Sequence, residues 1–69
     1  MGRYSATVGS RLLMLMRSRR VSTRDIAEAT GLSAATVWRI TQDKPATFAN
    51  VCAVADYFTI SIDWLRHGH

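Results

Sequence analysis

The chain has 69 residues and a net charge of +4, and 48% of its residues are apolar while 20% are charged. A chain this short buries only about 60% of its unfolded surface, which leaves room for one domain and none for a separate catalytic domain. The apolar content argues against disorder, and the longest apolar run, Leu12–Met16, is too short to span a membrane or to serve as a secretory signal.

A first helix is predicted over residues 7–19, where apolar side chains recur at helical spacing. Four of them fall on one face: Val8, Leu12, Leu15 and Met16. Leu13 and Met14 lie outside this stripe and are unusual on a solvated surface. We therefore expect these two side chains to contact a neighbouring element or a second subunit.

A second helix is predicted over residues 23–30. Ser22 can cap its first turn, and Asp25, three residues later, is favoured by the positive end of the helix. Gly31 then ends the helix, because glycine adopts the left-handed backbone conformation without steric cost.

A third helix is predicted over residues 34–42. Ser33 caps its first turn, and Val37 and Ile40 lie on its inner side. Residues 43–46 are predicted to form the loop that follows.

A fourth helix is predicted after the capping residue Thr47. Its buried stripe is expected to hold five side chains: Phe48, Val51, Cys52, Ala55 and Phe58. Ser61 begins a last turn over residues 62–66, which returns Ile62 and Leu65 to the core. Because no segment alternates convincingly with period two, the sequence predicts an all-α fold of five helices.

Residues 23–42, TRDIAEATGLSAATVWRITQ, have the features of two helices that cross at a tight turn. Six positions are restricted by this geometry: Ile26, Ala27, Gly31, Leu32, Val37 and Ile40. Ala27 is small where the next helix crosses close to it, Gly31 permits the sharp turn, and Leu32 fills the corner. The combination predicts a helix-turn-helix rather than a generic helical hairpin. In this motif the third helix leaves its outer face free to enter a major groove of DNA.

Positive charge is concentrated toward the N-terminus. Residues 1–24 contain no acidic side chain and six arginines: Arg3, Arg11, Arg17, Arg19, Arg20 and Arg24. The remaining residues hold three basic and five acidic side chains. A strongly basic end suits nucleic acid or an anionic membrane surface, and the alternative is a solvated basic face with no partner. Arg19 can instead interact with the negative end of the first helix.

The order of residues over most of the chain resembles the Xre family, the DNA-binding domains of lambdoid phage repressors and Cro proteins. Two segments carry the resemblance, VGSRLLMLMRSRRVSTRDIAEATGLSAATVWRI and TFANVCAVADYFTISIDWL. The closing ISIDWL is by itself typical of the end of the fourth helix and the start of the fifth in this family. It implies five helices and binding to double-stranded DNA as a homodimer. The resulting hypothesis is a Cro-like phage or prophage repressor that binds a pseudo-palindromic operator.

The chain departs from the pattern of that family at several positions. Thr23 stands where a glutamine usually contacts a phosphate. Met16 and Thr41 replace an arginine and a glutamate that often form a buried ion pair. Losing one partner alone would strand a buried charge at a cost of about 3–5 kcal/mol, whereas losing both can be nearly neutral. Asp43 and Thr59 stand where glycines usually follow the third and fourth helices.

Ten residues are candidate DNA contacts: Thr23, Arg24, Ser33, Ala34, Ala35, Thr36, Trp38, Arg39, Lys44 and Asn50. Arg39 is the best candidate for reading a base, because a guanidinium can bind O6 and N7 of guanine together. Its alternative role is a phosphate contact or a surface charge. The methyl groups of Ala34 and Ala35 can meet thymine methyls, or these residues simply favour the helix. Thr23 and Arg24 flank the same face and can contact the DNA backbone.

The other candidates have roles set by their place around the third helix. Trp38 either presses its ring against the DNA or folds it over the loop after the helix. Ser33 and Thr36 fit phosphate contacts at the helix start, where free amides favour an anion. Lys44 and Asn50 are expected on the far rim of the interface, as the resemblance implies.

The resemblance also places a subunit contact near the fifth helix, formed by Ile60, Trp64 and Arg66. Cys52 is expected to be a core thiol, and as the single cysteine it cannot form an internal disulfide. His67 and His69 are expected in a frayed tail, and with one cysteine they do not make a structural zinc site. We expect no metal and no cofactor.

Two other functions compete with that of a phage repressor. An antitoxin that represses its own operon would need a surface for its toxin, for which the apolar pair Leu13 and Met14 is the only candidate. A protein-interaction module could keep the fold and lose DNA readout, which Ala34 and Ala35 permit and Arg39 opposes. An enzyme is disfavoured, because no catalytic set of carboxylates or nucleophile with histidine lies on the predicted helices.

The expected organisation is a single domain with its core in residues 8–66, short flexible ends and no further C-terminal module. The expected location is the cytoplasm of a bacterial cell, at the nucleoid.

Overall fold

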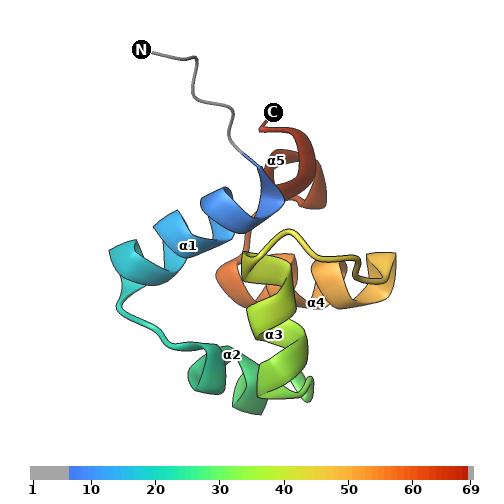
Figure 1. The fold of residues 1–69 in the computed structure, drawn as a ribbon. Helices are drawn as coiled ribbons and strands as arrows, with labels where there is room; N and C mark the ends of the chain where they lie inside the picture. Colours follow the sequence, from blue (N-terminus) through green and yellow to red (C-terminus); the bar gives the residue numbers. More distant parts are fainter. Residues whose placement is uncertain (1–6, 69) are drawn as a thin grey trace.

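The computed structural model describes residues 7–68 and contains five α-helices among them (Figure 1). The helices are α1 (Val8–Arg19), α2 (Thr23–Thr30), α3 (Ala34–Thr41), α4 (Phe48–Phe58) and α5 (Ile62–His67). Residues 7–68 contain no strand, so the predicted all-α fold of five helices is confirmed. Arg3, His69 and the expected flexible ends at 1–6 and 69 lie outside the described residues. No helix within 7–68 is long and apolar enough to cross a membrane.

Each helix begins after a serine or threonine whose hydroxyl accepts a hydrogen bond from a backbone N–H of the first turn. These N-caps are Thr7, Ser22, Ser33, Thr47 and Ser61. In α2 the bond is reciprocated, since the carboxylate of Asp25 accepts from the backbone N–H of Ser22 at 2.9 Å. Such a cap typically contributes about 1 kcal/mol to helix stability. Local sequence therefore sets where all five helices start.

Side chains from all five helices form one hydrophobic core. Its buried members are Leu12, Met16, Ile26, Val37, Ile40, Val51, Val54, Ala55, Phe58 and Leu65. The stripe predicted for α4 is wrong at one end, because Phe48 is 58% exposed. Phe48 is the first residue of its helix and reaches past the edge of the core, whereas Val54, which was not predicted, is fully buried. Cys52, expected to be a core thiol, is only half-buried.

The helix α1 crosses the end of α3 at very short range. Gly9 is buried, and a Cβ there would overlap the backbone carbonyl of Thr41. The carboxylate of Asp43 accepts hydrogen bonds from the Gly9 N–H at 2.8 Å and from the Thr7 hydroxyl at 2.7 Å. The start of α1 is therefore fastened to the residues that follow α3.

Three non-glycine residues have a left-handed backbone: Arg20, Asp43 and Thr59, with φ of 56°, 58° and 56°. The last two are the positions where the resembled family usually carries glycine, and this conformation is the physical reason for that preference. Aspartate tolerates the left-handed region, whereas a β-branched threonine is a genuine outlier there. The chain keeps the turn geometry without the glycines.

Arg11 does not belong to an exposed basic face as the N-terminal charge run implied. Its side chain is 9% exposed. Nε donates to the carbonyl of Leu65 at 2.9 Å and Nη2 to the carbonyl of Arg66 at 2.8 Å. Carbonyls at the end of a helix have no partner within it, and a cation is favoured there. Arg11 therefore holds α5 against α1.

The remaining apolar and basic side chains of α1 are divided between core and surface. Leu13 packs against the core, whereas Met14 is 53% exposed. Together with Ser10 and Arg17 they line a shallow cleft of about 430 Å³ on the outer side of the helix. The guanidinium carbon of Arg19 lies 5.7 Å from the ring centroid of Phe58.

The carboxyl end of the described chain is more ordered than the sequence suggested. His67, expected in a frayed tail, is the last residue of α5. Gly68 then ends the helix in a left-handed conformation, with φ 83°.

Candidate nucleic-acid interface

The helices α2 and α3 meet at a tight turn whose geometry depends on Gly31. This residue has φ 81°, and nothing lies within 4 Å of where a Cβ would be. Glycine is therefore required for its backbone conformation and not for space. The hydroxyl of Thr30 donates to the Ile26 carbonyl at 2.7 Å and accepts from the Leu32 N–H at 3.3 Å, which braces the turn.

The predicted helix-turn-helix packs through the residues that the sequence assigned to it. Ile26, Val37 and Ile40 are buried, and Ala27 and Leu32 are half-buried against them. This packing fixes α3 by its inner side. The outer side of α3 is consequently left without cover from the other residues in 7–68.

Four of the candidate contacts on α3 are exposed: Ala34, Ala35, Trp38 and Arg39. Thr36, on the side toward α4, is half-buried. Residues four and three apart share one face of a helix, so Ala35, Arg39 and Gln42 form a row along the outside. Gln42 is exposed and was missed by the sequence analysis, although its spacing of three from Arg39 could have indicated it.

The start of α3 carries polar groups but no acidic residue in its first turn. The Ser33 hydroxyl accepts from the Thr36 N–H at 3.0 Å and donates to the Thr36 hydroxyl at 2.8 Å. These two hydroxyls are thus held together by capping. An anion can approach this helix end without meeting a negative charge.

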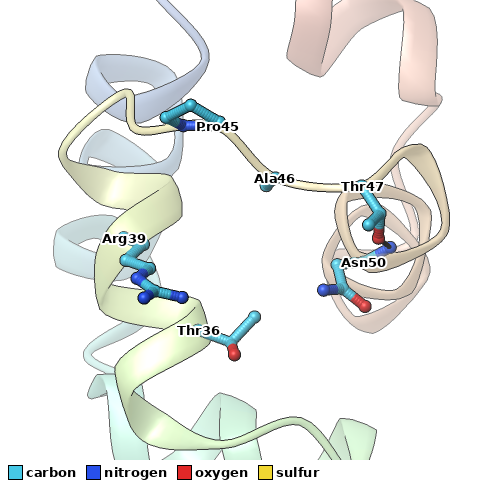
Figure 2. Close-up of a pocket in the computed structure, with 6 residues that line it drawn as sticks. All are labelled: Thr36, Arg39, Pro45, Ala46, Thr47 and Asn50. Atoms are coloured by element: carbon cyan, nitrogen blue, oxygen red, sulfur yellow. Dashed lines mark hydrogen bonds between the residues drawn. The ribbon is translucent and has the colours of Figure 1, made fainter.

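A cleft of about 320 Å³ lies between α3, the following loop and the start of α4. Six residues line it: Thr36, Arg39, Pro45, Ala46, Thr47 and Asn50. Figure 2 shows Arg39 and Thr36 on one wall and Asn50 facing them from α4. We call this the reading cleft. Pro45, Ala46 and Thr47 were not expected to contribute to it.

Some polar groups in the reading cleft already form hydrogen bonds within the protein, and others do not. Thr47 caps α4 by accepting from the Asn50 N–H at 3.1 Å. Within residues 7–68, no hydrogen bond or ion pair engages the guanidinium of Arg39 or the side-chain amide of Asn50. The cleft therefore presents a guanidinium and an amide, two groups that can bind base edges or phosphates.

Lys44 and Asn50, both expected on the far rim of the interface, line different clefts. Lys44 lines a second cleft, of about 200 Å³, together with Val8, Asp43, Arg66 and others. Ala46 lines both clefts, so the loop between α3 and α4 forms the ridge that separates them.

The candidates on α2 lie at its start. Thr23 is the first residue of the helix and half-buried, and Arg24 follows it and is exposed. Trp38 is 49% exposed and belongs neither to the core nor to the lining of the two clefts beside the loop. The ring of Trp38 is therefore accessible from solvent beside the exposed face of α3.

The three residues proposed for a subunit contact differ in how far they are buried. Ile60 and Trp64 are half-buried and pack against the core. Arg66 is exposed, and its guanidinium carbon lies 5.4 Å from the ring centroid of Phe48. Arg66 is therefore directed toward the start of α4. No group of three or more metal-binding side chains occurs within residues 7–68.

The chain matches the model of a known protein family. Residues 11–63 match the model of the Cro/C1-type HTH DNA-binding domain. The matched segment contains the whole helix-turn-helix and all of α4. No curated protein and no solved structure gives a significant match to the chain.

Proposed function

The chain belongs to the Cro/C1-type helix-turn-helix family of DNA-binding regulators, and on this premise we propose that it is a repressor that binds a pseudo-palindromic operator as a homodimer. The observation that supports readout of sequence is the unengaged guanidinium of Arg39 in the reading cleft, opposite Asn50. A regulator of this kind performs no catalysis, and its specificity comes from contacts with base edges.

Each candidate contact has a role that follows from its position. Arg39 binds O6 and N7 of a guanine, which is the commonest specific contact in a major groove. Ala34 and Ala35 allow close approach of the helix and contact thymine methyls. Thr36 and Asn50 donate to the edge of the same groove or to its adjoining phosphates.

The backbone of the DNA is contacted from both ends of the interface. At the α2 side, Thr23 and Arg24 lie at a helix start, where a phosphate is favoured. At the other side, Lys44 approaches from the loop beyond α3. Ser33 contributes through the amides of the helix that it caps. Trp38 presses on the sugars or on a thymine methyl.

Two copies are needed because one small domain makes few contacts. A homodimer engages two half-sites about 34 Å apart on one face of the duplex, which combines both sets of contacts. We propose that Ile60 and Trp64, near the turn between α4 and α5, contribute to the subunit contact. A phage or prophage origin is the biological setting in which such Cro-like repressors are expected.

The function is tested by selecting a randomised duplex pool with the protein at two salt concentrations, followed by sequencing. We expect a pseudo-palindrome with half-sites one helical turn apart. The variant Arg39→Ala should lose preference at one base pair of each half-site. Arg17→Ala, an exposed arginine on the outer side of α1, is the matched control and should keep the selected sequence.

A different outcome would count against readout of sequence. If binding is weak, falls steeply with salt and enriches no sequence, the protein has charge without readout. The hypothesis of a protein-interaction module would then be preferred.

A further inference from the structure

The second cleft holds two cations beside the proposed DNA interface. It is lined by Val8, Ile40, Asp43, Lys44, Ala46, Val51 and Arg66. The loop with Ala46 is the wall that it shares with the reading cleft. A DNA strand that crosses this loop would pass from one cleft to the other.

The single acid in the second cleft is already engaged by the protein. Each carboxylate oxygen of Asp43 accepts a hydrogen bond, one from the Gly9 N–H and the other from the Thr7 hydroxyl. Neither Lys44 nor Arg66 has a hydrogen bond or an ion pair from its side chain within residues 7–68. The two cations are therefore available to an anion from outside.

Phe48 supports one of these cations. Its ring is 58% exposed, and the guanidinium carbon of Arg66 lies over it at 5.4 Å. A cation over an aromatic face is held by the negative face of the ring. An arginine can bind a phosphate through two N–H groups, and a contact with a ring leaves these donors available because it uses none of them as a hydrogen bond. The contact with Arg66 accounts for the exposed position of Phe48.

We propose that Arg66 and Lys44 bind one phosphate of the DNA backbone next to the reading cleft, and that Phe48 is the positioning residue for Arg66. The proposal rests on the proposed DNA-binding function. It moves Arg66 from the subunit contact to the DNA interface. Because a phosphate carries no sequence information, this contact adds affinity and fixes register without changing the preferred sequence.

The test is the salt dependence of binding to a labelled duplex, measured by fluorescence anisotropy for the full chain. The logarithm of the binding constant falls with the logarithm of salt concentration, with a slope of about 0.9 per phosphate neutralised. The double variant Arg66→Ala/Lys44→Ala should lower this slope by about that amount per bound protomer, and each single variant should lower it by less. Arg17→Ala, away from both clefts, should leave it unchanged and is the control.

Two further variants test the role of the ring. Phe48→Leu keeps Arg66 and its charge but removes the aromatic face, and it should weaken binding several-fold at low salt. Phe48→Tyr keeps the face and should bind like the wild type. Circular dichroism of each variant checks that it is folded. Arg66→Lys provides a second substitution at this position, which keeps the positive charge and loses the ability to bind a phosphate through two N–H groups.

Sedimentation of the free protein separates this proposal from the subunit contact. If Arg66→Ala leaves the salt slope unchanged and weakens self-association without DNA, Arg66 belongs to the subunit contact and the proposal is wrong. An equal affinity for Phe48→Leu and Phe48→Tyr would overturn the role of the ring. If the wild type itself binds no duplex, the proposed function fails and this inference fails with it.

Discussion

Two positions with the same backbone conformation are expected to respond in opposite ways to the same substitution. Thr59 and Asp43 have φ of 56° and 58°. A left-handed backbone costs a non-glycine residue about 1–2 kcal/mol. The Thr59 side chain is exposed and makes no hydrogen bond within the described chain. Thr59→Gly should relieve this strain. Glycine also adds backbone entropy to the unfolded chain, which costs about 0.5–1 kcal/mol. The free energy of unfolding should therefore rise by roughly 0.5–1 kcal/mol.

Asp43→Gly relieves a smaller strain and loses two hydrogen bonds. The carboxylate of Asp43 joins the loop after α3 to Thr7 and Gly9 at the start of α1. A hydrogen bond to a charged group contributes about 1.5–3 kcal/mol, and the lower end applies because Asp43 is exposed. After subtracting the relief of strain and adding about 0.5–1 kcal/mol for the backbone entropy of glycine in the unfolded chain, we expect a net loss of about 2–3 kcal/mol of stability.

The assay is urea unfolding followed by circular dichroism, with all variants at one protein concentration so that self-association does not differ between them. For a small domain the free energy of unfolding falls by about 1 kcal/mol per molar urea. The midpoint should therefore rise by roughly 0.5–1 M for Thr59→Gly and fall by about 2–3 M for Asp43→Gly. Asp43→Asn, which keeps one acceptor oxygen, should fall between wild type and glycine. Midpoints that move in the same direction would refute the reasoning that separates strain from the carboxylate contacts.

Three other substitutions have defined outcomes. Gly9→Ala should destabilise the fold by about 1–3 kcal/mol, because the new Cβ overlaps the rigid backbone at Thr41; thermal unfolding measures this, and an unchanged melting temperature would contradict the close crossing of α1 and α3. Arg11→Ala should lower the free energy of unfolding by about 2–4 kcal/mol, because it removes packing and two hydrogen bonds to helix-end carbonyls. Urea unfolding measures this loss. A loss below about 0.5 kcal/mol would show that Arg11 only covers the surface. Arg39→Ala should reduce discrimination at one base pair by about 1–3 kcal/mol, with Arg17→Ala unaffected; competition between duplexes measures it, and equal losses for all duplexes would indicate a phosphate contact instead.

Features that depend on neighbouring residues in the chain were predicted from the sequence. Four of the five helices start after the expected residues, Ser22, Ser33, Thr47 and Ser61, because capping is decided within one turn. Thr7 was predicted as part of the first helix and is instead its N-cap. The helix-turn-helix was predicted because Gly31 and the apolar positions around it must satisfy one local geometry. For the same reason the exposure of Ala34, Ala35 and Arg39 could be predicted, since it follows from the burial of the opposite face of α3.

Features that depend on distant residues were not predicted. The partners of Arg11 are 54 and 55 residues away, and charge alone placed it on a basic surface. Phe48 satisfies the spacing of a buried stripe, but it lies in the first turn of α4, past the edge of the core, and its ring stays 58% exposed although Arg66 of α5 lies over it. Asp43 was noted only as a missing glycine, while its carboxylate contacts α1 across 34 to 36 residues. Periodicity shows which face of a helix is apolar and not how far the core extends along it.

The hydrogen bonds from Arg11 to α5 also determine which part of the molecule opens first. They join residues that are 54 and 55 positions apart, and closing a longer loop costs more entropy. The helices α2 and α3 are adjacent in sequence and pack through short-range contacts. Amide hydrogens of α5 should therefore exchange through a local opening that leaves α2 and α3 intact. Such an opening of α5 would then leave α3, the helix proposed to face DNA, fully formed.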